Sequence, residues 1–140
     1  MEWAALIAWI ATAGGGFFLL SIWLSRGGMQ QQREAGMRIR PPLILAHFLL
    51  AATGLVLWII YVATDSNALA WVAFALLGVV AVLGFTMFAI WFQRRQRGPA
   101  REAAGIPAEQ HFPVPVVGLH GLLAVTTVVL VLLAAVGVGD

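Results

Sequence analysis

Four long stretches of the chain contain no charged side chain, and they limit the folds it can adopt more than any other feature. They cover residues 3–24, 43–63, 69–92 and 116–138. A helix of about 20 apolar residues, at about 1.5 Å per residue, crosses the roughly 30 Å hydrocarbon core of a bilayer. The sequence therefore predicts four transmembrane helices.

The composition indicates the same class of protein. Of the 140 residues, 61% are hydrophobic and only 10% are charged, whereas a soluble domain has about 25% charged residues. We expect one all-α domain over residues 1–140, an integral membrane four-helix bundle with up-down connectivity. The chain has no cysteine, which excludes disulfides, iron–sulfur clusters and covalently attached c-type haem.

The charged residues predict an orientation in the membrane. Every basic residue is an arginine, and the eight arginines lie in two groups between the apolar stretches: Arg26, Arg33, Arg38 and Arg40, then Arg94, Arg95, Arg97 and Arg101. By the positive-inside rule, both long loops are cytoplasmic and both termini are outside a cell membrane. The same rule accounts for the basic charge, so we expect no nucleic-acid partner.

The second and fourth stretches share a pattern of residue types. Pro42 and His47 match Pro115 and His120 within the order P-x4-H-x-L-L-A-x-T, at an offset of 73 residues. The first and third stretches share G-F-x4-I-W, which begins at Gly16 and at Gly84, at an offset of 68 residues. The chain is therefore interpreted as two tandem helical hairpins, residues 1–63 and 64–140, related by a pseudo-twofold axis along the membrane normal.

The two matched histidines are the candidate site. His47 and His120 each lie five residues after a proline, so both are expected at the same depth, near the cytoplasmic side. In an up-down bundle the second and fourth helices occupy opposite corners. If both side chains face the axis, two imidazoles approach one point from opposite sides, which is the arrangement of axial ligands on a haem iron.

Small residues and arginines complete the predicted site. A porphyrin needs space beside its ligands, and short side chains lie near both histidines, while arginines can pair with haem propionates. The predicted cofactor-binding residues are Ala51, Ala124, Gly54, Gly118, Gly121, Gly16, Gly84, Arg40 and Arg94.

In its topology and its two matched histidines, the sequence resembles the four-helix, bis-histidine membrane cytochromes of the b type. The resemblance covers the helices and neither long loop. It implies one non-covalent haem b with His47 and His120 as axial ligands of the iron. It further implies an electron carrier, rather than a stand-alone enzyme, that exchanges single electrons with quinol or with a redox protein docked on the cytoplasmic face.

Two other functions remain open from the sequence. The chain is alternatively a non-catalytic membrane subunit or scaffold of a larger complex, in which each histidine bonds a neighbouring carbonyl. The second alternative is a transition-metal binding or transport protein, for which Met87 offers a soft third ligand suited to copper. His111 is expected in a loop at the headgroup level.

Overall fold

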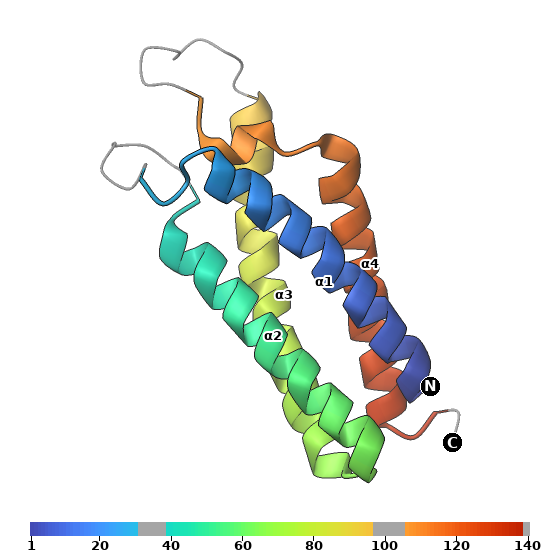
Figure 1. Ribbon diagram of the computed structural model, residues 1–140. Helices are drawn as coiled ribbons and strands as arrows, with labels where there is room; N and C mark the ends of the chain where they lie inside the picture. The colour runs from blue at the N-terminus through green and yellow to red at the C-terminus, as the bar shows by residue number, and fades with distance from the viewer. Residues whose placement is uncertain (31–38, 97–105, 139–140) are drawn as a thin grey trace.

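The computed structural model describes residues 1–30, 39–96 and 106–138, and the regular structure within them is helical. The elements are α1 (Glu2–Ser25), α2 (Pro41–Thr64), α3 (Asn67–Gln96), the short 3-10 helix η3 (Ala108–His111) and α4 (Val114–Ala135) (Figure 1). All four α-helices are long enough and apolar enough to cross a membrane. The prediction of four such helices is confirmed, and it is compatible with a multi-pass membrane protein.

Glycines in the left-handed conformation end two of these helices. After α1, Gly27 has φ +77° and the amide of Gly28 donates to the carbonyl of Trp23 at 2.9 Å. Gly137 has φ +80° and ends α4 in the same way. This is the Schellman arrangement, which satisfies the last carbonyls of a helix and favours glycine because it has no Cβ. Gly137 is the reason that α4 stops at Ala135, short of the predicted residue 138.

Two of the arginines lie in a helix and not in the predicted loop. Arg94 and Arg95 were expected in a loop, but α3 continues through Gln96 and contains both. A helix C-terminus carries partial negative charge, so arginines in the last turn are stabilised there. Arg95 also lies over the ring of Trp91, 5.2 Å from its centre. Four of the predicted loop arginines lie outside the described residues: Arg33, Arg38, Arg97 and Arg101. The acidic residues Glu34, Glu102 and Asp140 lie outside them as well.

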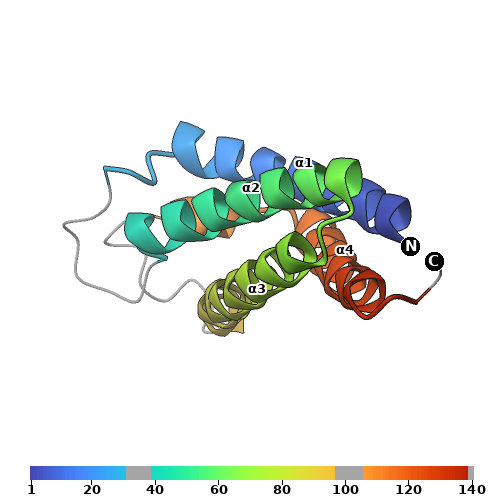
Figure 2. The ribbon, with the colours of Figure 1, turned by 90° about the horizontal axis from the view of Figure 1, so that it is seen from below.

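Two helix pairs form the most extensive contacts. α1 packs along α4 and α2 packs along α3, while smaller contacts join α1 to α2 and α3 to α4. Viewed from below, α1 and α2 lie above α4 and α3 (Figure 2). The helices that carry the two predicted histidines, α2 and α4, therefore lie across the bundle from each other.

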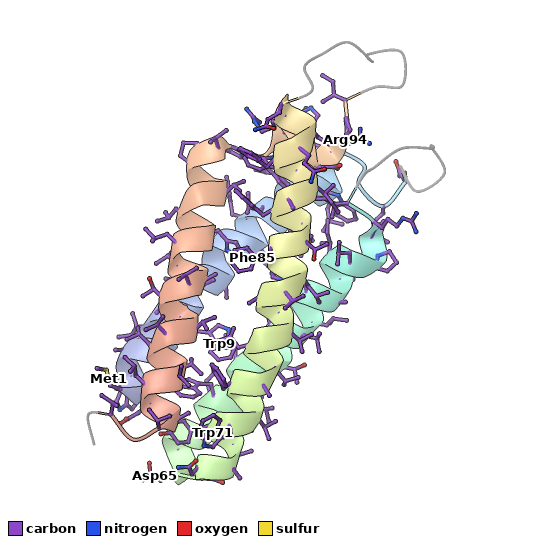
Figure 3. The ribbon with its side chains drawn as sticks, turned by 180° about the vertical axis from the view of Figure 1, so that it is seen from behind. Met1, Trp9, Asp65, Trp71, Phe85 and Arg94 are labelled. Atoms are coloured by element: carbon purple, nitrogen blue, oxygen red, sulfur yellow. The ribbon has the colours of Figure 1, made fainter. Side chains whose placement is uncertain are left out.

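The buried apolar side chains form two separate clusters. One lies toward the chain termini and is built around Trp9 and Trp58, whose ring centres are 6.3 Å apart. The other lies toward the opposite end and contains Trp23, Trp91 and Ala108. Many other large apolar side chains are exposed, such as Phe85 on α3 at 63% (Figure 3), as expected of surfaces that face lipid.

The helix η3 was not predicted from the sequence. It lies beside the ends of α1 and α3, and it carries Glu109, whose side chain is 1% exposed. The amide of Ile39, just before α2, donates to Oε1 of Glu109 at 3.3 Å. A buried carboxylate is costly unless it accepts hydrogen bonds, so this contact ties the segment before α2 to the segment before α4.

Candidate functional site

The side chains of His47 and His120 meet in the interior of the bundle. Their ring centres are 6.4 Å apart and their planes are inclined at 66°. One ring comes from α2 and the other from α4, so the contact spans the bundle. The sequence pattern had predicted that these two residues would approach one point, and the structure brings them together.

Each histidine is fixed by a carbonyl of the adjacent helix. Nδ1 of His47 lies 3.0 Å from the carbonyl oxygen of Val80 on α3, and Nδ1 of His120 lies 3.0 Å from that of Thr12 on α1. A carbonyl oxygen only accepts hydrogen bonds, so Nδ1 is the protonated nitrogen in both rings. Nε2 is therefore the nitrogen with a free lone pair, and it is the one available to a metal.

A glycine makes room for each imidazole. A Cβ added to Gly16 would lie 2.9 Å from Cε1 of His120, and one added to Gly84 would lie 3.2 Å from Cε1 of His47. Each glycine comes four residues after the residue whose carbonyl holds the ring. Residues four apart share a face of a helix, so the carbonyl that accepts the hydrogen bond and the space left by the glycine lie side by side. We call each such pair, Thr12 with Gly16 and Val80 with Gly84, a notch.

The two notches correspond residue by residue. Val80 follows Thr12 by 68 positions, the same offset that relates Gly84 to Gly16. The contacts of His47 with α3 therefore match the contacts of His120 with α1. Neither Thr12 nor Val80 was identified as a site residue from the sequence, because they act through backbone carbonyls, which leave no signal in side-chain type. An alignment of residues 1–63 with residues 64–140 at the offset of 68 places Thr12 opposite Val80.

The surroundings of the two rings differ at one point. The hydroxyl of Thr12 is hydrogen-bonded to that of Thr127 at 3.0 Å, and Thr127 is fully buried. The residue that matches Thr127 in the first half is Gly54, which has no side chain. Val80 likewise has no hydroxyl where Thr12 has one.

The residues around the histidines are less buried than those of the two clusters. His47, His120 and their glycines are only partly buried, and so are Ala51 and Ala124, one turn further along α2 and α4. None of these six residues belongs to either buried cluster. Gly16 and Gly84 contact the imidazoles, whereas Ala51 and Ala124 lie one turn further along the helices that carry them.

Three predicted residues lie elsewhere. Gly54 packs against Trp9, where a Cβ would come within 2.9 Å of the indole, so this glycine makes room for a core side chain. Gly118 and Gly121 are on the exposed surface of α4, with open space where a Cβ would be. None of these three glycines has a histidine ring within 4 Å of its Cβ position.

The two predicted arginines lie toward the loop end of the bundle. Arg40 is exposed, whereas Arg94 is partly buried, and its Nε is buried without a hydrogen-bond partner among the described residues. Met87 packs against the cluster that contains Trp23 and Trp91. His111 lies on η3, and its Nδ1 is also buried without a partner in the described part of the chain.

No larger metal-binding group accompanies the histidine pair in the described residues. Residues 1–30, 39–96 and 106–138 contain no cluster of three or more His, Asp or Glu side chains that could hold a metal ion. A tetrahedral zinc site, which needs four ligands, is therefore not formed there. The nitrogen ligands that this layer of the bundle offers to a metal are the two imidazoles of His47 and His120.

Comparison with known proteins gives no match: no family, no curated protein and no solved structure corresponds to this chain. The functional argument therefore rests on the geometry of the site.

Proposed function

We propose that the protein is a membrane cytochrome of the b type that binds one haem between His47 and His120 and carries single electrons. The observation that carries this proposal is the facing pair of imidazoles, each held through Nδ1 by a carbonyl of the neighbouring helix. Because Nδ1 of each ring faces a carbonyl oxygen, Nε2 is the nitrogen that each ring would offer to a metal.

The separation of the rings fits a metal ion between them. A metal bonded to one nitrogen of each ring at about 2 Å would place the ring centres about 6 Å apart. The observed distance is 6.4 Å. Two rings much further apart than this could not both bind one ion.

The hydrogen bonds of the rings suit the role of ligands. A metal-binding histidine usually donates its second nitrogen to a carbonyl or carboxylate, which fixes the ring and strengthens it as a ligand. The carbonyls of Val80 and Thr12 do this for His47 and His120. A haem held by His47 and His120 would supply one-electron redox chemistry, which suits electron transfer.

The partners of the carrier follow from its location. An electron donor or acceptor reaches this layer either as quinol within the membrane or as a redox protein on the loop side. The arginines at that end, Arg40 and Arg94 among them, favour an acidic docking partner and offer guanidinium groups to haem propionates.

The proposal includes an arrangement in the membrane. Two tandem hairpins in up-down order, with both long loops cytoplasmic and both termini outside, account for the arginine distribution and for the matching offsets of 68 and 73 residues. The paired carbonyl and glycine contacts of the two histidines support the relationship between the halves.

Absorption spectroscopy of the purified protein tests the proposal. We expect a strong Soret band with the sharp reduced bands of low-spin haem, lost in His47→Ala and in His120→Ala. Leu49→Ala and Leu122→Ala are matched controls, because these residues follow the histidines on the same helices and are 60% and 65% exposed. In His47→Gly or His120→Gly, added imidazole should restore the low-spin bands.

Two outcomes would contradict the proposal. Full haem occupancy with unchanged bands in either histidine variant would show that the residue is not a ligand. A protein without haem that contains stoichiometric copper or another transition metal would favour the second candidate, a metal-binding or transport protein. That candidate is supported by the same ring separation, because two imidazoles at 6.4 Å also accommodate a bare ion.

The scaffold alternative makes a different prediction. A purely structural histidine would also bond a neighbouring carbonyl, and it would need nothing at Nε2. If the purified protein carries neither haem nor metal, and cannot be loaded with haem, the histidines join the helices and do no more.

A further inference from the structure

Four buried polar atoms at the loop end of the bundle have no hydrogen-bond partner among the described residues. They are Nε1 of Trp91, Nε of Arg94, Nε2 of Gln110 and Nδ1 of His111. A buried polar atom without a partner costs about 1–3 kcal/mol, so unpaired atoms are rare in native proteins. All four lie at the same end of the molecule, on α3 and η3.

The four atoms come from two elements that contact each other. Trp91 and Arg94 are three residues apart on α3 and so share a face of that helix. Gln110 and His111 are adjacent on η3, which packs against α3 and α1. The buried cluster that includes Trp91 also includes Ala108 of η3. Figure 3 shows Arg94 at the end of α3.

The chemistry of these atoms defines the partner. An indole nitrogen, a guanidinium nitrogen and an amide nitrogen can only donate hydrogen bonds, and the guanidinium is always charged. The imidazole nitrogen can donate as well. A partner that satisfies them must offer several acceptor oxygens and a negative charge, which describes a phosphate or a carboxylate and excludes a cation.

We propose that Trp91, Arg94, Gln110 and His111 form a binding site for an oxyanion, occupied by the phosphate of a membrane lipid. Trp91 is only 4% exposed, and Arg94 is partly buried, so these donors are not fully solvated surface groups. A second source of the same chemistry is a propionate of the haem proposed above. The lipid site does not depend on that haem, and the experiment separates the two sources.

The test measures lipid binding directly by native mass spectrometry. Delipidated protein is titrated with dioleoylphosphatidylglycerol and, separately, with dioleoylglycerol, which has the same acyl chains and no phosphate. We expect a one-to-one adduct with the phospholipid only. Arg94→Gln should weaken its binding about tenfold, the loss expected for one charge-assisted hydrogen bond.

Arg95→Gln is the matched control. It removes the same charge from the next residue of α3, but the Arg95 side chain is exposed and lies over the Trp91 ring. We expect its phospholipid affinity within about twofold of that of the unmodified protein, as for a screened surface charge. If Arg94→Gln does not fold, Gln110→Leu removes one donor at nearly constant size and should weaken binding in the same direction.

The double variant His47→Ala/His120→Ala distinguishes the two sources. Equal phospholipid binding by the unmodified protein and this variant identifies the lipid phosphate as the occupant. Binding only by the haem-free variant would overturn the lipid as the occupant, because it would show that a haem propionate fills the oxyanion site in the loaded protein. Equal binding of dioleoylglycerol, or equal losses in Arg94→Gln and Arg95→Gln, would overturn the proposal.

Discussion

Gly16 and His120 are in direct contact across the interface of α1 and α4, and the imidazole occupies the space where a side chain on Gly16 would begin. The added Cβ would lie 2.9 Å from Cε1 of the ring, closer than real Cβ atoms approach a neighbour. The position of this ring, and with it the direction of Nε2, therefore depends on the absence of a side chain at Gly16.

The substitution Gly16→Ala should weaken haem binding more than Gly84→Ala. The Cβ at residue 84 would lie 3.2 Å from His47, so that ring has to move less. Overpacking of this kind costs about 1–3 kcal/mol. Haem occupancy can be measured from the ratio of Soret to protein absorbance. Gly14→Ala is the control, because nothing lies within 4 Å of its Cβ position, and an equal loss in this variant would rule out the ring contact as the cause.

The haem-free protein should contain His47 and His120 as the Nδ1–H tautomer. Both Nδ1 atoms face carbonyl oxygens at 3.0 Å, and only a protonated nitrogen can bond to them. Nitrogen-15 NMR of protein labelled at histidine distinguishes the two neutral tautomers. His111→Gln assigns the third signal by its disappearance. Detection of the Nε2–H form at either core histidine would show that its lone pair points at the helix and not at the site.

Gly54→Ala should destabilise the cluster around Trp9 and leave the histidine layer intact. Its Cβ would lie 2.9 Å and 3.1 Å from two atoms of the Trp9 ring, which is packed against Trp58. We expect a loss of about 1–3 kcal/mol in the free energy of unfolding, measured in detergent. Gly78→Ala serves for comparison, since its Cβ would meet nothing within 4 Å. A wild-type stability in Gly54→Ala would contradict this packing.

The absence of cysteine allows a direct test of the proposed orientation. A cysteine introduced at Asn67, at the start of α3, should react with a membrane-impermeant maleimide added to intact cells. A cysteine at Gln96, at the other end of the same helix, should react only after the membrane is permeabilised, because the positive-inside rule places that end in the cytoplasm. The reverse pattern of labelling would invert the topology.

The four helices could be predicted from the sequence, but which side of each helix faces the interior of the bundle could not. Charge-free stretches long enough to cross a membrane identify α1 to α4, and the matched spacing placed His47 and His120 together. The same sequence placed Gly118 and Gly121 beside the site, although both are exposed. A helix that is apolar all round has no polar face to mark its outside, so periodicity cannot orient it.

The remaining differences have local causes. The arginines at the end of α3 were assigned to a loop because they are charged, yet the helix extends through them and its C-terminal dipole favours them. The short helix η3 was missed because four residues carry no periodic signal. Its buried Glu109 therefore could not be distinguished from an exposed loop carboxylate.

The hydrogen bond between the hydroxyls of Thr12 and Thr127 makes the two ends of the imidazole pair unequal. Thr12 supplies both the carbonyl that holds His120 and the hydroxyl that binds α4, whereas Val80 supplies a carbonyl alone. Two hydrogen bonds therefore join Thr12 to α4, one to His120 and one to Thr127, whereas a single hydrogen bond joins Val80 to His47 on α2. Two histidines that look interchangeable in the sequence would then respond differently to heat, and the contact of His47 with α3 would loosen first.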